Sequence, residues 1–210
     1  MTTILRGTET DTLELDGALP ASARPSVPAP LRIADDPVRV NVLFFAMHGL
    51  TVRGIPWPAF DYHEALWRIA VTLDGEPAWF ATACDLDSPT IRALGRVVVR
   101  YPTRIARFAG RWSVEVDGRS MSTRVTEGTE SPDPVAGRRT FVCDGGRAYE
   151  IPWEEIAAPR RCVASVDVVS DSLSEPTFGA GVTWARSGLV HHGRIHMCGV
   201  ARRIRPRSRG

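Results

Sequence analysis

The residues best suited to chemistry begin in the segment 60–68, which reads FDYHEALWR. In a β-strand, side chains alternate, so Tyr62, Glu64 and Arg68 would share one face. A carboxyl group buried on that face has a raised pKa and can exchange protons near neutral pH. Arg68 can pair with Glu64, which lowers that pKa, or it can hold a substrate carboxylate in bidentate fashion. The alternative for Glu64 is an ordinary surface position.

A second segment, residues 93–109, reads ALGRVVVRYPTRIARFA and follows after a hairpin-like stretch. The order and separation of the two segments resemble the acetoacetate decarboxylase family. In that family an aromatic-x-Glu-Ala strand precedes a hairpin, and a short helix ends in Gly-Arg-Glu, an aromatic-Pro pair and two lysines. The matching residues, within about residues 55–110, are Tyr62, Glu64, Ala65, Gly95, Arg96, Tyr101 and Pro102.

The departure from the family is as informative as the match. The family's nucleophilic lysine falls on Thr103 and its partner lysine on Arg104, and all 26 basic residues of the chain are arginine. In the family, the second cation lowers the pKa of the first amine, which then forms an imine with a ketone. Thr103 cannot form an imine, so we predict no Schiff-base decarboxylase activity.

The resemblance therefore implies a small-molecule enzyme that uses acid/base chemistry instead. Enolisation, dehydration, isomerisation or cyclisation of a keto acid or polyketide-like metabolite all suit a glutamate in an apolar cavity. We predict Glu64 as the acid/base, with Thr103 and Tyr62 supplying catalytic hydrogen bonds. The predicted substrate-binding residues are Arg68, Arg104, Trp57, His63 and Tyr101, and Arg104 has a solvent-facing strand position as its alternative.

Two further function classes stay open at this point. A non-catalytic small-molecule-binding protein would keep the pocket after losing decarboxylase activity. A structural or interaction module would use the arginine-rich end of the chain, ARRIRPRSRG, as a contact surface.

Cysteine and histidine spacing does not indicate a metal site or a cofactor. The four cysteines, at positions 84, 143, 162 and 198, form no CxxC pair, and we expect buried thiols in a cytoplasmic protein. His63 and Glu64 begin like a zincin motif, but the second histidine is missing. In segment 191–198 a strand would put His192, His196 and Cys198 on one face, opposite His191. That set is compatible with a zinc or copper site, with the lining of a polar pocket, or with ordinary side chains of a strand. Of these alternatives, we predict that there is no metal site.

The elements that must position these residues are mainly strands. Asp-Gly pairs at 74–75, 117–118 and 144–145 interrupt alternating segments and predict three hairpins. One short helix is expected near residues 89–99, with Ser88 as N-cap, Pro89 at the first position and Pro102 beyond its end. The fold class is mainly β (α+β), an antiparallel barrel or cone like that of acetoacetate decarboxylase.

Domain organisation follows from composition. Residues 1–37 are rich in Thr, Ala, Pro and Asp, and we expect an extended or partly disordered arm. Residues 38–204 would form one β-barrel domain and residues 205–210 a basic tail. The chain of 210 residues has a net charge of +2 and no apolar run long enough for a membrane span. We expect a small-molecule partner, anionic or keto-containing, and neither nucleic acid nor membrane; a homo-oligomer stays open.

Overall fold

The structure, a computed structural model, describes residues 5–6, 9–23, 25–54, 58–131, 139–155, 160–197 and 200–204. Trp57, Cys198 and the tail 205–210, all named in the sequence predictions, lie outside these residues. In chain order the elements are β1 (Leu5–Arg6), β2 (Glu9–Ala18), β3 (Arg32–Ile33), β4 (Arg39–Val52), β5 (Phe60–Leu73), β6 (Glu76–Leu86), α1 (Pro89–Leu94), the π-helical turn η1 (Gly95–Val99), β7 (Thr103–Ile105), β8 (Arg107–Phe108), β9 (Ser113–Val116), β10 (Arg119–Glu130), β11 (Arg139–Asp144), β12 (Arg147–Ile151), β13 (Trp153–Glu155), β14 (Arg160–Asp171), α2 (Ser174–Phe178), β15 (Thr183–Trp184), β16 (Ser187–Gly193), β17 (Ile195–Met197) and β18 (Arg202–Arg203).

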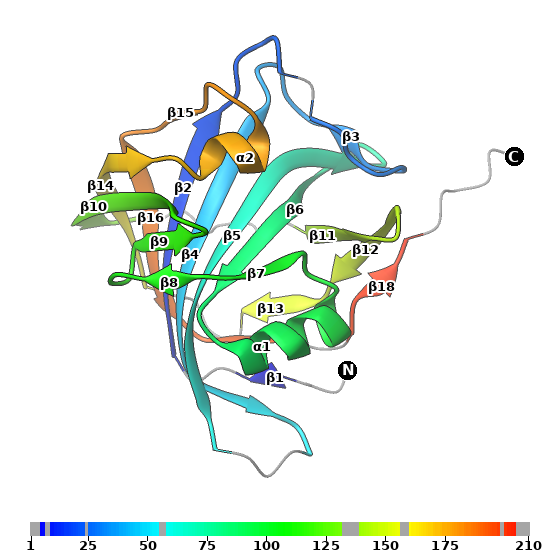
Figure 1. Cartoon of the computed structure of the whole chain (residues 1–210), viewed down its shortest axis with the longest axis vertical. Coiled ribbons are helices and arrows are strands. Elements are labelled where there is room, and N and C mark those ends of the chain that lie inside the picture. Colours follow the sequence, from blue (N-terminus) through cyan, green and yellow to red (C-terminus); the bar gives the residue numbers. More distant parts are fainter. Residues whose placement is uncertain are drawn as a thin grey trace, which may run out of the picture.

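These strands confirm the mainly β prediction. The long strands β2, β4, β5 and β6 lie side by side and antiparallel, and β16 and β14 extend the sheet beyond β2. On the other side, β6 pairs in parallel with both β7 and β11, so the sheet is mixed rather than purely antiparallel. Figure 1 shows a strongly bent sheet with α2 in the upper part of the view and α1 in the lower part. None of the helices in the described residues is long and apolar enough to cross a bilayer.

The segment expected as an N-terminal arm contains an inner strand of this sheet. Strand β2 pairs along its length with β4 and continues onto β16 on its other side. Leu13 and Leu15 are fully buried. Residues 9–18 therefore belong to the sheet, and the domain boundary predicted at residue 38 is wrong for them. Their apolar side chains alternate with polar ones that face the other side of the sheet.

The turns follow the sequence closely. Asp74–Gly75 and Asp117–Gly118 both have positive φ at both residues, as a tight hairpin turn with right-handed strand twist requires. The third hairpin, β11–β12, turns one position later than predicted. Gly145 and Gly146 carry its positive φ values, and Asp144 is the last residue of β11, paired with Arg147.

The predicted helix is present in two parts. Ser88 accepts a hydrogen bond from the backbone N–H of Ile91 at 3.3 Å, and Pro89 occupies the first turn of α1. From Gly95 the chain continues as the π-helical turn η1, which ends at Arg100 in the left-handed conformation. The segment leads directly into β7 and so fixes where Tyr101 and Thr103 lie. A second short helix, α2, was not predicted.

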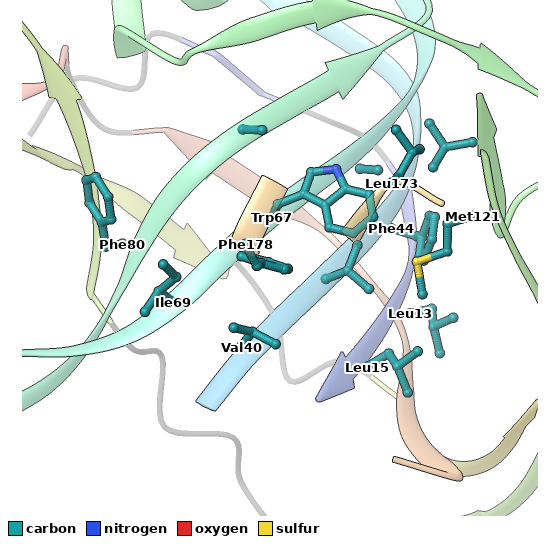
Figure 2. Packing of buried hydrophobic residues seen from close by; sticks show 14 of the residues in the cluster. Leu13, Leu15, Val40, Phe44, Trp67, Ile69, Phe80, Met121, Leu173 and Phe178 are labelled. Carbon is teal, nitrogen blue, oxygen red and sulfur yellow. The ribbon is translucent and has the colours of Figure 1, made fainter. Parts of the chain in front are cut away.

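Both faces of the central strands are covered, and each face has its own apolar cluster. On one face Trp67 of β5 packs against Phe178 of α2, near Phe44 of β4; Figure 2 shows this cluster. On the opposite face Tyr62 and Leu66 of β5 belong to a cluster that includes Ile91 of α1 and Tyr101. We call this second side the Glu64 face, because Glu64 lies on it.

A β-bulge in β6 decides which residues of that strand reach the Glu64 face. Near the hairpin turn, Arg68 pairs with Ala81; one step on, Trp67 pairs with Ala83, and Thr82 is the additional residue. Paired residues share a face, so the bulge places Cys84 on the Glu64 face and Asp85 on the opposite face. Without it, the register set at the turn would bring Asp85 opposite Glu64.

Candidate functional site

Glu64 lies in the middle of the sheet in apolar surroundings. Its neighbours on the adjacent strands are Phe45 of β4 and Leu86 of β6. Only 6% of Glu64 is exposed. The alternative of a surface glutamate is therefore excluded, since the carboxyl has lost nearly all contact with water.

Burial dominates the acid–base behaviour of this carboxyl. Desolvation raises the pKa of Glu64 from 4.5 to about 7, although hydrogen bonds from the Cys84 thiol and the Tyr62 hydroxyl lower it. The negative charge of Asp85 also raises it. Burial also raises the pKa of Tyr62 well above its usual value, so Tyr62 keeps its proton and acts as a donor. Near neutral pH the carboxyl is thus able to give or accept a proton.

Arg68 shares the face of Glu64 but does not neutralise it. Four residues along a strand separate the two Cα atoms by about 13 Å. The Arg68 Nη2 donates to the Glu14 carboxylate at 2.9 Å, and Nε donates to the Asn41 side chain at 2.9 Å. Arg68 also lies over the Trp79 ring, 4.8 Å from its centroid. Of the two roles left open for Arg68, pairing with Glu64 is therefore the wrong one, and desolvation prevails at Glu64.

Two of the predicted substrate-binding residues lie on the opposite face of the sheet. Arg104 pairs with Asp85 through Nε at 2.5 Å and Nη2 at 2.8 Å. Asp85 also accepts a hydrogen bond from Trp67 Nε1 at 2.7 Å. His63 Nδ1 lies 2.9 Å from Asp87. Neither Arg104 nor His63 is brought to the side where the Glu64 carboxyl points.

Thr103 and Tyr101 are brought to the Glu64 face. Both are buried. Thr103 pairs with Cys84 across the parallel β6–β7 edge, so it lies one strand further from Glu64 than Cys84 does. Its hydroxyl accepts a hydrogen bond from Arg96 Nε at 3.0 Å, and its backbone carbonyl accepts one from Arg96 Nη2 at 3.2 Å. The cation that contacts Thr103 is therefore Arg96, whereas Arg104 contacts Asp85.

Sequence reasoning missed Cys84 and Arg96 as neighbours of this site. Arg96 belongs to the Gly95–Arg96 pair that carries the family resemblance, and that pair was the available signal. Cys84 had no local signal, because the bulge at Thr82 changes which residues of β6 face Glu64.

The histidine segment does not assemble a metal site among the residues that the structure describes. His192 Nδ1 lies 2.7 Å from Asp11, whereas His191 points to the other face, with Nε2 3.8 Å from Glu14. No group of three or more His, Cys, Asp or Glu side chains within the described ranges could hold a metal ion. Cys198 is outside those ranges, as noted above.

Comparisons with known proteins identify the fold. No family model and no curated protein matches the sequence. The structure superposes on the enduracididine biosynthesis enzyme MppR, complexed with the condensation product of pyruvate and imidazole 4-carboxaldehyde, with a TM-score of 0.72 at 15% identity over 97% of this chain and 90% of that one. A structure of MppR complexed with pyruvate is also similar to this chain, with a TM-score of 0.73 at 14% identity over 97% of this chain and 91% of that one.

Two decarboxylase-related structures agree with this result. For acetoacetate decarboxylase from Legionella pneumophila the TM-score is 0.64 at 12% identity, covering 97% of this chain and 88% of that one. For an acetoacetate decarboxylase-like enzyme from Sphingomonas wittichii RW1 it is 0.67 at 16% identity, covering 97% and 94%. The chain has the fold of the acetoacetate decarboxylase-like superfamily.

Proposed function

We propose that this protein is a small-molecule enzyme in which Glu64 moves a proton to and from a keto acid or a related keto-containing metabolite. The observation that carries the proposal is a buried carboxyl with a pKa of about 7, held by two neutral donors. The fold supports the substrate class, because MppR has been solved with pyruvate bound.

The proposed step is removal of a proton from the carbon next to a ketone. The ionised Glu64 carboxylate accepts that proton, and the C–H electron pair moves into an enolate whose negative charge collects on the former ketone oxygen. The Thr103 hydroxyl accepts from Arg96, so its own proton is available for donation to that oxygen. Return of the proton from Glu64 to carbon completes an enolisation cycle, and no imine is formed.

The same face supports a binding role for Tyr101, which is buried beside this apolar cluster. Arg68 is engaged with Glu14 and Asn41, so an anionic ligand group would have to share its guanidinium with these partners. A non-catalytic binding protein would use the same residues, and it would bind the keto acid without moving a proton.

Hydrogen–deuterium exchange at the methyl group of pyruvate distinguishes the two proposals. Pyruvate is incubated with the protein in D₂O, and the methyl signal is followed by ¹H NMR against the uncatalysed rate. We expect the protein to accelerate exchange, and we expect the rate to rise with pH as Glu64 ionises, because its carboxylate form is the base; the pKa of about 7 belongs to the ligand-free protein.

Substitution of the base provides the decisive comparison. Glu64→Gln should reduce the protein-dependent rate by about 10²-fold or more, the usual contribution of a general base. Glu115→Gln, on the exposed side of β9, serves as the matched control and should leave the rate unchanged. Saturable pyruvate binding without exchange above background would favour the binding protein, whereas absence of both would reject the keto acid as ligand.

A further inference from the structure

The buried thiol of Cys84 lies between Glu64 and Thr103, the two side chains of the proposed step. The proposed step itself does not involve this thiol. Cys84 is fully buried within β6. Glu64 pairs with Leu86, and Cys84 pairs with Leu66, so Cys84 and Glu64 are diagonal neighbours on one face. Diagonal neighbours in an antiparallel pair are within reach of long side chains such as that of glutamate. On its other side Cys84 pairs with Thr103.

The surroundings of Cys84 favour a donor over a nucleophile. Burial raises the pKa of the thiol well above its usual value, and the nearby carboxylates of Glu64 and Asp85 raise it further, whereas the positive charge of Arg104 acts in the opposite direction without reversing the shift. Because the thiolate is the reactive form of cysteine, a thiol that stays protonated is a poor nucleophile. What it retains is one S–H group, and this group is hydrogen-bonded to Glu64.

We propose that Cys84 is a positioning residue for Glu64. The Cys84 thiol donates to the Glu64 carboxylate and, together with the Tyr62 hydroxyl, fixes the orientation of that carboxylate. The proposal rests on the proposed function for its catalytic meaning, but the hydrogen bond can be tested without any substrate. A thiol is a weaker donor than a hydroxyl. It therefore holds the carboxylate in place while stabilising its charge less than serine would, which leaves Glu64 a better base.

The experiment measures the titration midpoint of Glu64 directly. The carboxyl is followed by ¹³C NMR in protein labelled at glutamate side chains, and Glu64→Gln assigns its signal. Cys84→Ala removes the donor, and we expect the pKa of Glu64 to rise by about half a unit to one unit, the value of one hydrogen bond. Cys84→Ser restores a donor, so its midpoint should lie below that of the alanine variant.

Cys162→Ala is the matched control. Cys162 is also buried, but it lies on β14, outside the set of groups that shift the pKa of Glu64, so the midpoint should not move. Equal midpoints in wild type and Cys84→Ala, or equal midpoints in the alanine and serine variants, would overturn the proposal, since either result removes the role of the S–H donor.

The wild-type protein gives an independent measurement if a variant at position 84 fails to fold. The S–H stretching band of cysteine lies in a part of the infrared spectrum free of other protein bands. We expect one S–H band to shift to lower frequency as Glu64 ionises, with the same midpoint, and this shift should be absent in Glu64→Gln. An S–H spectrum that does not respond to pH would contradict the proposal. Loss of pyruvate exchange alone would instead count against the proposed function.

Discussion

A carboxyl group inside a sheet keeps its proton to an unusually high pH unless its surroundings compensate for the loss of water. Glu64 receives such compensation only from neutral donors, the hydroxyl of Tyr62 and the thiol of Cys84. These stabilise the carboxylate less than a guanidinium would, so desolvation prevails. The result is a group that is half ionised near neutral pH, which is the condition under which proton transfer in both directions is efficient.

The raised pKa of Glu64 makes this residue costly for stability at high pH. The pKa of Glu64 is about 7 in the folded protein and 4.5 in the unfolded chain. The free energy of unfolding is therefore highest below pH 4.5, and it falls as the pH rises through about 7. The loss amounts to about 3 kcal/mol. We therefore expect Glu64→Gln to unfold at higher urea concentration than wild type at about pH 8.5, with a much smaller difference at about pH 5.

Denaturant titrations at the two pH values check this expectation, and Glu115→Gln, on an exposed position of β9, is the control. A wild-type protein that equals the Glu64→Gln variant in stability at both pH values would show that the carboxyl is not desolvated in solution.

At the scale of elements, local sequence signals predicted the hairpins and the helix. They did not predict the register between β5 and β6, nor that β2 is a strand of the sheet. The Asp74–Gly75 turn and the Ser88 cap act over a few residues, so the sequence reveals them directly. Strand β2 depends on partners far along the chain, and its Pro-rich context obscured the alternation of Leu13 and Leu15. The bulge at Thr82 has no sequence signature that distinguishes it from regular strand.

Three strands are joined on the Glu64 face by one buried polar network. Arg68 of β5 donates to Asn41 of β4 and to Glu14 of β2. Replacing Arg68 by Met removes the charged donor of the Glu14 carboxylate and the donor to the Asn41 side-chain oxygen, and leaves Glu14 with the longer bond from Asn41 Nδ2 at 3.4 Å. We therefore expect a loss of about 2–3 kcal/mol in the free energy of unfolding. Urea denaturation measures the loss.

The double variant Arg68→Met with Glu14→Gln removes the uncompensated charge and should recover part of that stability. If Arg68→Met were as stable as wild type, the network would not be what ties β2 to its neighbours. If the stability loss of the double variant equalled the sum of the losses in Arg68→Met and Glu14→Gln measured separately, Arg68 and Glu14 would not be coupled.

For the whole molecule, a family resemblance over about a quarter of the chain was enough to predict the fold, because its short motifs lie in the correct order. Placement of the site residues was predictable only in part. Alternation along β5 correctly put Tyr62, Glu64 and Arg68 on one face, but it could not show that Arg68 has partners on β2 and β4. Nor could it show that Arg104 faces Asp85 instead of Glu64.

The complete absence of lysine allows a test on the intact chain. Incubation with acetoacetate and borohydride should give no covalent adduct on an internal residue, because no side-chain amine is present to form an imine. Intact-mass spectrometry followed by peptide mapping measures this, with a lysine-dependent decarboxylase as positive control. An adduct mapped to any position other than the N-terminal amine would contradict the expectation.

The position of Arg104, held by Asp85 behind the sheet, has a consequence for the charge balance of ligand binding. No arginine is among the described groups that shift the pKa of Glu64, so an incoming anion would find no counter-charge at that carboxyl. Its negative charge would favour the protonated form of Glu64 still more. Anionic ligands that settle there would therefore draw a proton from the buffer as they bind, and their apparent affinity would weaken as the solution becomes more alkaline.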